Sequence, residues 1–536
     1  MEDTCRMMIE LPSKTLAALV EAAARTYGSK PALVVYDKSL SYEELYQRAR
    51  RTASALLGDG LEPGDHVALW LPNDFAFTEL TFACAMAGLV IVPLNTRLRS
   101  SDAADALAKS RAKALFFTES FLGVDYLAMV ETLVSSGQLP QLRRVVNVGS
   151  LERGSLVCLQ RWLDAAHPAP LPEVDENAPA ALNFTSGTTS SPKAAVLSNR
   201  SVVHIAREVA VRMEISPSDR MASAMPFYHN GGLIPTLLSC MMAGCTLYTQ
   251  PKFDADYTLE TIGRERCTIA GGVGTMFVMM LDSPKLASTD LTSIRAARVT
   301  GPADMRRRIW EAFGHPMLFS LYGMTESTAA VTLTCPGDSM DEQLNTNGKP
   351  LPGTAIRIVD AQGAPVAQAV HGLIEIGGES VMQGYYADAA ATAAVLTDDG
   401  WIRSGDIGYM DGRGNVVLVG RQKDMYRSGG ENVACAEVEE FLRSHPAVLH
   451  AAVLGVPDPR LDEVGFAYIE PRSGHDVQPA DLQAYCRANL ANFKVPRYVQ
   501  IRNGLPLTVS GRVEKHKLKD EACLVAKQMA AGSHKA

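Results

Sequence analysis

The segment from Thr185 to Lys193 combines the side chains that phosphate binding requires. It reads Thr-Ser-Gly-Thr-Thr-Ser-Ser-Pro-Lys, so hydroxyl groups surround one glycine and the run ends at a lysine. Glycine lets the backbone approach a ligand, hydroxyl and amide groups donate hydrogen bonds, and lysine supplies positive charge. We therefore expect a loop that wraps a polyphosphate through Thr185, Ser186, Gly187, Thr188, Thr189 and Lys193.

This loop differs from a Walker-type phosphate loop, in which the lysine follows a glycine and precedes Ser or Thr. Here Lys193 lies between Pro192 and Ala194. The alternative interpretation is a surface linker rich in serine and threonine. The further motifs along the chain favour the phosphate loop.

A second motif, Tyr322-Gly-Met-Thr-Glu326, follows the apolar run from Met317 to Leu321. The aromatic ring offers a stacking face. A carboxylate is a hard oxygen ligand that suits magnesium, which also takes phosphate oxygens. The alternative is a helix start, with Thr325 as the cap and Glu326 in the first turn. Both interpretations can hold at once.

Single polar residues elsewhere are suited to chemistry but are weaker evidence. Asp406, in Ser404-Gly-Asp, can accept two hydrogen bonds from a diol, although aspartates are common in turns. Arg421 and Lys423 supply positive charge, and the alternative is a pair of solvated surface cations. His229 is a lone histidine in Pro-Phe-Tyr-His, a setting more often structural than functional.

Alternating helices and strands must position these residues. Ala180–Phe184 reads as a short strand that leads into the phosphate loop. Tyr42–Leu57 has helical spacing, and two short apolar runs, His66–Trp70 and Leu89–Val92, read as buried strands. This alternation predicts α/β layers with parallel strands.

The pattern changes near Gly420. The strand-like run Asn415–Val419 leads into the polar, turn-like segment Gly420–Asp424. About 110 residues follow, a typical size for a separate domain. This segment has its own predicted elements: helix Cys435–Ser444, strand Leu449–Val456 and helix Ala480–Leu490. We predict a large α/β domain over residues 1–422 and a small α+β domain over residues 423–536, with a hinge at Lys423. A plain loop is the alternative at this boundary.

Composition limits the class of protein. The chain has 536 residues, too many for one core, and a net charge of −8, which disfavours a nucleic-acid partner. The first ten residues lack a basic start followed by a long apolar run, so we expect no secretion signal, and the longest apolar stretch, Phe82–Leu94, is too short to span a bilayer. The ten cysteines are scattered. We expect a cytoplasmic protein with free thiols and no membrane insertion.

Taken together, these motifs resemble the adenylate-forming enzymes, which include acyl-CoA synthetases, luciferases and nonribosomal peptide adenylation domains. The resemblance runs from about Leu16 to Leu518, with the motifs in the family's order. It implies a large multi-layer N-terminal domain and a small mobile C-terminal domain. It also implies a ligase that joins a small carboxylic acid to AMP, from magnesium-ATP, and then passes the acyl group to an acceptor.

The sequence alone does not decide which acceptor receives the acyl group. The resemblance favours the thiol of coenzyme A, because that is the commonest acceptor in the family. An amine acceptor, which would give an amide, is the first alternative, and luciferase-like oxygenation is less favoured. A protein of a different class would only bind the adenylate and catalyse nothing.

The resemblance also implies residue roles. Tyr322 would lie against adenine, Thr325 would contact the phosphates, Glu326 would bind magnesium, Asp406 would hold the ribose and Arg421 would contact the nucleotide. His229 would border the acyl pocket, which Gly271–Thr275 and Thr300–Ala303 would line. The loop Arg427–Asn432, with Gly429 and Gly430, would admit a narrow arm such as pantetheine. The pocket segments carry Leu233, Met276, Phe277 and Met324, which predicts an apolar acyl group of moderate size.

The chain departs from the family pattern at several positions. Family members usually have a lysine where Arg512 stands, and that lysine bridges the carboxylate and the α-phosphate. Arginine keeps the charge but is larger and forked. Arg512 takes this role, or Lys515 reaches in, or adenylation is slower. Ser190 and Ala194 replace usual glycines, Asn199 stands where histidine is common, and Gly274 stands where proline is common.

Overall fold

The computed structural model describes residues 8–151, 156–185, 192–301, 303–428, 431–458, 461–507 and 513–532. The chain divides into two compact units. The first comprises the residues up to Thr300 together with Arg306–Ile356 and Ile376–Arg403. The second comprises Gly301–Met305, Arg357–Glu375 and the residues from Ser404 onward. The hinge at Lys423 and the domain boundary predicted at that residue stay predictions.

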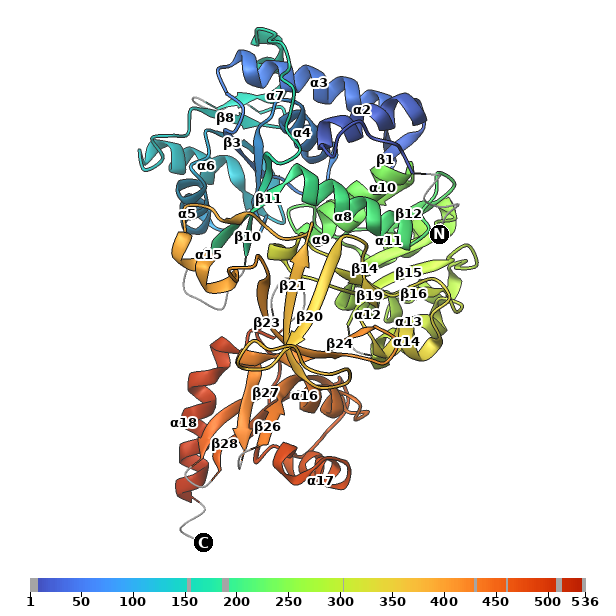
Figure 1. Cartoon of the computed structure of the whole chain (residues 1–536), viewed down its shortest axis with the longest axis vertical. Coiled ribbons are helices and arrows are strands. Elements are labelled where there is room, and N and C mark those ends of the chain that lie inside the picture. Colours follow the sequence, from blue (N-terminus) through green and yellow to red (C-terminus); the bar gives the residue numbers. More distant parts are fainter. Residues whose placement is uncertain are drawn as a thin grey trace. The chain divides into compact units, whose positions relative to one another are not determined.

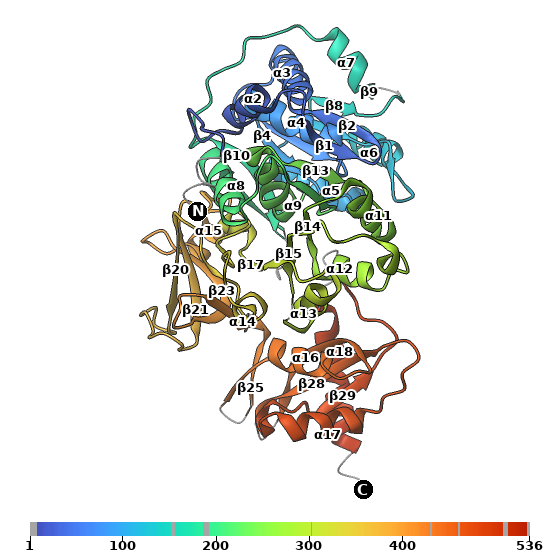
Figure 2. The same ribbon diagram turned by 90° about the vertical axis from the view of Figure 1, so that its right-hand side faces the viewer.

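The first unit contains two large sheets, as Figures 1 and 2 show. Within the described ranges, one sheet has seven strands, and its neighbouring pairs are parallel except at β2. In spatial order they are β16 (Met317–Phe319), β15 (Ala296–Thr300), β14 (Ile269–Val273), β12 (Arg220–Ser223), β13 (Thr246–Thr249), β1 (Pro31–Val35) and β2 (Lys38–Ser41).

The second large sheet has eight strands among the described residues. Their order is β22 (Gly384–Tyr385), β11 (Lys193–Ser198), β10 (Pro179–Thr185), β4 (Val90–Pro93), β3 (His66–Trp70), β5 (Ala114–Phe117), β8 (Arg144–Asn147) and β9 (Val157–Cys158). A small sheet of β17 (Leu321–Tyr322), β18 (Thr332–Leu333) and β19 (Lys349–Pro350) accompanies them.

Helices cover these sheets. They are α2 (Leu16–Tyr27), α3 (Tyr42–Gly58), α4 (Phe75–Met86), α5 (Ser100–Ser110), α6 (Tyr126–Ser135), α7 (Leu159–Ala165), α8 (Asn199–Arg212), α10 (Ser239–Ala243), α11 (Ala255–Glu265), α12 (Gly274–Leu281), α13 (Ala303–Ala312), α14 (Met340–Asn345) and α15 (Ala389–Val395). In Figure 1, α3 lies beside α2 and α4, which it contacts.

Local sequence explains why α3 begins and packs where it does. Ser41 and Glu44 form a capping box, which satisfies backbone N–H groups at the helix start. Leu45, Ala49 and Ala53 recur at helical spacing and are buried against the core. The predicted helix Tyr42–Leu57 is therefore confirmed with one residue added at its end.

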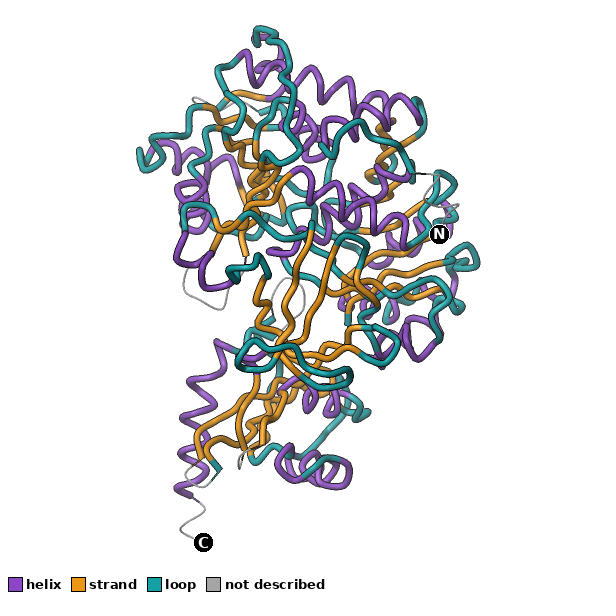
Figure 3. The backbone as a smooth tube through the Cα atoms, in the orientation of Figure 1, coloured by secondary structure: helices purple, strands orange, loops and turns teal. Residues whose placement is uncertain are grey.

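The second unit has most of a four-stranded sheet and, among the described residues, a sheet of five strands. Some strands of the four-stranded sheet begin or end with residues that belong to the first unit. The first consists of β20 (Thr354–Val359), β21 (Gly372–Gly378), β23 (Ile402–Met410) and β24 (Val416–Arg421). The second consists of β26 (Glu431–Ala434), β25 (Met425–Ser428), β28 (Asp462–Pro471), β27 (Val448–Asp458) and β29 (Tyr498–Ile501). Helices α16 (Cys435–Arg443), α17 (Pro479–Asn489) and α18 (His516–Gly532) accompany it, and α18 runs along β27 (Figure 3).

The predicted α/β class is confirmed, and most predicted elements lie within one or two residues of the observed ones. The glycine-rich segment Gly271–Thr275 is the end of strand β14 and the start of helix α12. One local expectation needs correction. The segment Gly420–Asp424 continues strand β24 to Arg421 before one turn of 3₁₀ helix, Gln422–Asp424.

Candidate active site

The two ends of the predicted phosphate loop lie together on neighbouring strands. Thr185 is the last residue of β10 and Lys193 the first of β11, and the two residues pair directly in the antiparallel ladder. Ser186, Gly187, Thr188, Thr189 and Ser190 lie outside the described residues. The hairpin therefore fixes where the loop leaves and re-enters the sheet, as the predicted strand Ala180–Phe184 implied.

Lys193 and Glu326 both contact the side chain of Tyr385. The Lys193 ammonium lies 5.2 Å from the centroid of the Tyr385 ring. The Tyr385 hydroxyl donates a hydrogen bond of 2.7 Å to Oε1 of Glu326. Burial, with a smaller contribution from Glu326, raises the pKa of Tyr385 well above its ordinary value, so the hydroxyl stays protonated as a donor. Tyr385 thus links the phosphate-loop cation to the predicted magnesium ligand.

Sequence reasoning missed Tyr385. The tyrosine lies 59 residues from Glu326, and its strand, β22, has two residues. Its place is set by pairing with Ala195 on β11. No local pattern marks such a residue, because its significance comes from a long-range strand pairing.

Glu326 itself is buried, with 7% of its surface exposed, in a short 3₁₀ helix over Thr325–Ser327. Its carbonyl oxygen accepts a hydrogen bond from the Met382 amide at 2.9 Å. The helix-start interpretation of this motif is confirmed in part, since the helix begins at Thr325 but the cap position is Met324. Tyr322 is buried at the end of β17.

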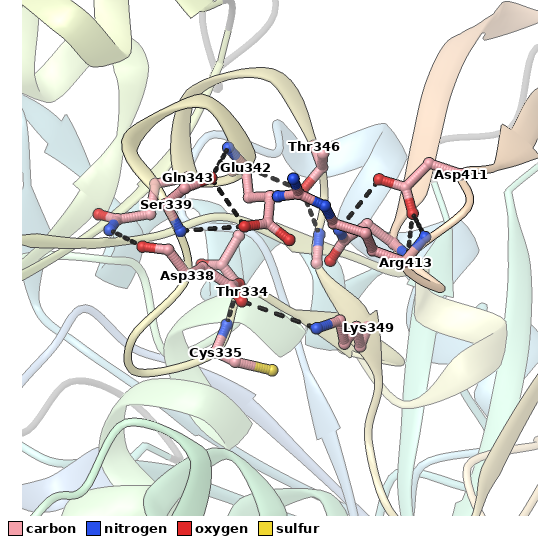
Figure 4. Close-up of polar contacts among 12 residues, drawn as sticks. Thr334, Cys335, Asp338, Ser339, Glu342, Gln343, Thr346, Lys349, Asp411 and Arg413 are labelled. Atoms are coloured by element: carbon pink, nitrogen blue, oxygen red, sulfur yellow. Dashed lines mark hydrogen bonds and ion pairs between the residues drawn. The ribbon is translucent and has the colours of Figure 1, made fainter.

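Figure 4 shows polar contacts among residues downstream of the motif, from Thr334 to Lys349. The Thr334 hydroxyl accepts from the Ser320 amide at 3.0 Å and donates to the Leu318 carbonyl at 2.9 Å. Gln343 on α14 accepts from the Leu318 amide at 2.9 Å. Asp338 accepts from the Cys335 amide at 2.6 Å. The bonds of Thr334 and Gln343 fix the path of β16 and of Ser320, which precedes β17.

Asn230 connects this motif to the segment of His229. The Asn230 side-chain amide donates to the Thr325 carbonyl at 3.4 Å. Its Oδ1 atom is buried and has no hydrogen-bond partner among the described residues, so a donor on a ligand would satisfy it. His229 is exposed, and its ring neighbours Tyr228 at 5.9 Å between centroids.

Two predicted nucleotide contacts, Asp406 and Arg421, meet in the second unit. They pair across β23 and β24, and Nε of Arg421 lies 3.2 Å from Oδ1 of Asp406. Asp406 is buried, and its amide donates to the Ser404 hydroxyl at 3.0 Å. The aspartate stands inside a strand, where a turn was the alternative. Lys423 belongs to the 3₁₀ turn that follows.

Lys515 forms an ion pair inside the second unit. Its Nζ atom lies 2.7 Å from Oε1 of Glu439 on α16, and the same oxygen accepts from the Val453 amide at 2.7 Å. Burial alone would lower the pKa of Lys515, but Glu439, Cys435 and Asp424 together outweigh burial and the pKa is raised. Arg512, Gly429 and Gly430 lie outside the described residues.

Within the first unit, the predicted pocket segment Gly271–Thr275 lies beside Thr300, the first residue of the other predicted pocket segment. β14 carries Gly271 and Gly272, and Thr300 ends the adjacent strand β15. Gly274 begins α12, on which Phe277 packs against Phe313 at 5.6 Å between ring centroids. Sequence reasoning missed a charged neighbour, Arg298, buried in β15.

The substituted positions that the structure describes have packing roles. Ala194 is buried in the same apolar cluster that Phe184 packs against. Asn199 is buried and accepts from the Leu16 amide at 3.2 Å, so it ties α8 to the start of α2. Asn199 therefore serves the fold here.

Among the residues that the structure describes, no helix is long and apolar enough to cross a membrane. No group of three or more His, Cys, Asp or Glu residues in those ranges could hold a metal ion. The nine cysteines within the ranges are free.

Comparison with known proteins agrees with the motifs. The family model described as AMP-binding enzyme matches residues 20–386, and that of the AMP-binding enzyme C-terminal domain matches residues 437–512. A Rhodococcus jostii protein, 3-[(3aS,4S,7aS)-7a-methyl-1,5-dioxo-octahydro-1H-inden-4-yl]propanoyl:CoA ligase, is 35% identical over 96% of this chain and 100% of its own length.

A second relative, the medium-chain acyl-CoA ligase ACSF2, mitochondrial, of Mus musculus, is 31% identical over 95% of this chain and 88% of its own length. Among solved structures, ATP-bound MatB from Rhodopseudomonas palustris is similar with a TM-score of 0.85 and 28% identity, over 94% of this chain and 98% of that one. The predicted resemblance to adenylate-forming enzymes is confirmed, and the chain belongs to the AMP-binding enzyme family.

Proposed function

We infer that this chain is an ATP-dependent acid–CoA ligase that forms an acyl-adenylate and then an acyl-CoA. The observation that carries this inference is similarity along nearly the whole chain to two relatives that are both named CoA ligases. The acid is of moderate size and mainly apolar, in keeping with the predicted pocket. One relative is named for medium-chain acids and the other for a propanoyl group that carries a dioxo ring system.

In the first step, a carboxylate oxygen attacks the α-phosphorus of ATP. A new oxygen–phosphorus bond forms, and the bond to the β-phosphate oxygen breaks to release pyrophosphate. The protein contributes position and charge, the two effects expected to dominate such a transfer. Thr185 and Lys193 anchor the loop that holds the phosphates, while Tyr322, Asp406 and Arg421 hold the nucleoside.

Magnesium fits the residues at Glu326. Mg²⁺ binds through one or two carboxylates together with substrate phosphate oxygens. The Tyr385 hydroxyl orients the Glu326 carboxylate, which is buried near the end of the phosphate-loop hairpin. When bound there, the ion would neutralise charge on the phosphates.

Of the two candidate cations in the C-terminal motif, we assign adenylation to Arg512. Lys515 is committed to the buried carboxylate of Glu439, and releasing it would leave that carboxylate without its counter-charge. Arg512 keeps the charge of the usual lysine at the same position of the motif. Lys515 then positions the segment that carries Arg512.

In the second step, the small domain turns about Lys423, so that the Gly429–Gly430 loop can admit the pantetheine arm of coenzyme A. The thiol of coenzyme A loses its proton, its sulfur bonds to the acyl carbon, and the bond from that carbon to the AMP oxygen breaks. Domain motions of this kind often limit turnover. The cytoplasmic location stays a prediction, and ACSF2 is named as mitochondrial.

AMP release tests the proposal and its alternatives together. Purified protein with magnesium-ATP and a panel of medium-chain acids is assayed with coenzyme A, with amino acids or with no acceptor. We expect AMP release that depends on both an acid and coenzyme A. Release with amines but not with coenzyme A would favour an amide-forming ligase, and nucleotide binding without any turnover would leave an adenylate-binding protein.

Two variants control for a contaminating ligase. Glu326→Gln keeps the volume of the side chain but removes its charge, and we expect it to abolish turnover. Glu379→Gln makes the same change at a partly exposed carboxylate that pairs with Lys14, and we expect turnover to persist.

A further inference from the structure

Arg298 is a buried cation without an acidic partner. The residue is 3% exposed, in the middle of β15. Its guanidinium donates to the Pro235 carbonyl oxygen and to the Thr236 hydroxyl, both neutral acceptors. Burial lowers the pKa of Arg298 to about 10, so the group is still charged at neutral pH. Among the residues that the structure describes, no carboxylate forms an ion pair with it.

A buried charge is costly unless an opposite charge and hydrogen bonds offset the lost hydration. Arg295, three residues earlier on the same segment, shows the usual solution, since its guanidinium lies 2.7 Å from the Asp219 carboxylate. Arg298 has only the two neutral oxygens. The fold therefore maintains an uncompensated positive charge, which is suited to a negative or strongly polar group that arrives with a ligand.

The sheet makes room for this guanidinium. Ser223, Gly271 and Arg298 stand at matching positions of β12, β14 and β15, so they share one face of the sheet. A Cβ atom added at Gly271 would lie 3.1 Å from the Ser223 hydroxyl and 3.5 Å from Nη2 of Arg298. Because glycine has no side chain there, Arg298 extends over β14 toward Ser223.

This position lies among the segments assigned to the acyl group. Pro235 and Thr236 belong to the π-helical turn Leu233–Leu238, which begins four residues after His229. Such turns are frequent at functional sites. β14 continues into α12 at Gly274, and ligands of open α/β sheets bind beyond the carboxyl ends of the strands. The predicted pocket residues Leu233, Met276, Phe277 and Met324 are apolar, and Arg298 adds a buried charge to this region.

We propose that Arg298 is a specificity residue that recognises an oxygen acceptor at the far end of the acid, remote from the carboxylate that is activated. The acceptor is a second carboxylate or a ketone, since a guanidinium donates to both and pairs most strongly with the anion. This proposal rests on the proposed function, because it requires an acyl group beside β14. It adds one charged residue to the predicted pocket for an apolar acyl group of moderate size.

Acids matched in length test the proposal and separate the two sources of oxygen. One acid ends in a methyl group, one carries a ketone near its far end and one ends in a second carboxylate. We expect kcat/KM for acyl-CoA formation to be at least about tenfold higher for one of the oxygen-bearing acids than for the methyl acid. The carboxylate and ketone arms show which acceptor is preferred.

Variants then assign the preference to the residue. Arg298→Met should lose it, chiefly through a raised KM for the oxygen-bearing acid, and should treat the methyl acid as well as before. Arg298→Lys, which keeps the charge, should retain part of the preference. Arg212→Met is the matched control: it removes another buried arginine, one that donates to the Leu333 and Pro350 carbonyls, and should leave the preference intact.

The outcomes separate this proposal from the proposed function. The role of Arg298 alone would be overturned if the wild-type enzyme used the methyl acid with the same efficiency as the oxygen-bearing acids. It would also be overturned if the Arg298→Lys and Arg298→Met variants both kept the full preference. No AMP release with any acid would overturn the ligase itself. If Arg298→Met does not fold, Arg298→Lys and the thermal shift of wild-type protein with each acid still decide the matter.

Discussion

At the scale of single residues, the pair of Lys515 and Glu439 shows how a charged side chain acts through its neighbour. Both groups are mostly buried, and Glu439 also accepts a backbone hydrogen bond from Val453. Removing one partner of such a pair leaves the other charge uncompensated. The pair therefore has a positioning role for the C-terminal motif.

We predict that Lys515→Met lowers the free energy of unfolding by about 3 kcal/mol, the usual cost of breaking a buried pair. Glu439→Gln should have a similar effect, and the double variant should lose less than the sum of the two, as chemical denaturation would measure. Arg512→Ala should instead slow ATP–pyrophosphate exchange by about a hundredfold or more. Exchange that is slow in Lys515→Met but normal in both Arg512→Ala and Glu439→Gln would contradict the assignment.

The same pair makes a signed prediction for pH. Because the folded protein raises the pKa of Lys515 above its ordinary 10.5, the stability that the ion pair contributes is fully present below that value. It is lost as the pH rises through the raised pKa. The difference in stability between wild type and Lys515→Met should therefore shrink in strongly alkaline solution and stay constant near neutrality.

Residues whose neighbours are close in sequence were predictable, and those with distant neighbours were not. Thr185, Lys193 and Glu326 stand in compact motifs, although the structure places Thr185 and Lys193 at the ends of strands where a loop was predicted. Tyr385 and Arg298 act through partners on other strands or helices, at separations of 59 and 62 to 63 residues. Strand register decides such contacts, and register is not visible in local composition.

At the scale of elements, one aromatic side chain anchors the hairpin of β25 and β26. Tyr426 on β25 is 2% exposed and lies over the pair of β27 and β28. Gly455 and Gly465 face each other across that pair. A Cβ atom at Gly455 would lie 2.2 Å from Cβ of Tyr426, and one at Gly465 would lie 2.6 Å from its hydroxyl oxygen. The two glycines form the slot that the ring fills.

We predict that Gly455→Ala destabilises the protein by about 1–3 kcal/mol, because the added methyl group overlaps the fixed base of the Tyr426 side chain. The measurement is chemical denaturation of the full chain. Gly412→Ala is the control, since its Cβ would meet nothing within 4 Å, and it should change stability by less than about 0.5 kcal/mol. Equal stability of the two variants would show that the Tyr426 slot is not tight.

Periodicity predicted the elements well where it was strong. The spacing of apolar residues predicted the helix Tyr42–Gly58 up to Leu57, and a short apolar run predicted the strand His66–Trp70. Periodicity was less informative in glycine-rich segments. Glycine occurs in turns, but it also occurs in strands where another group lies close to the backbone. Gly271 is the second case, since Arg298 uses the space above it.

At the scale of the whole molecule, the proposed catalytic cycle uses residues from both compact units. The first unit carries Thr185, Lys193 and Glu326, and the second carries Asp406, Arg421 and the motif around Arg512. Composition and the change near Gly420 predicted two parts. The chain segments that make up each unit were not predictable, since Arg357–Glu375 joins the second unit through sheet pairing.

The central claim is that the acid's own oxygen becomes bonded to the α-phosphorus of ATP. The most direct test uses an acid whose carboxylate carries a heavy oxygen isotope, with ATP and coenzyme A, and mass spectrometry of the nucleotide product. The acyl-adenylate route leaves one labelled oxygen on the phosphate of AMP, because the sulfur attacks carbon and the labelled oxygen departs with AMP. Unlabelled AMP, or label in inorganic phosphate with ADP as the product, would contradict the account.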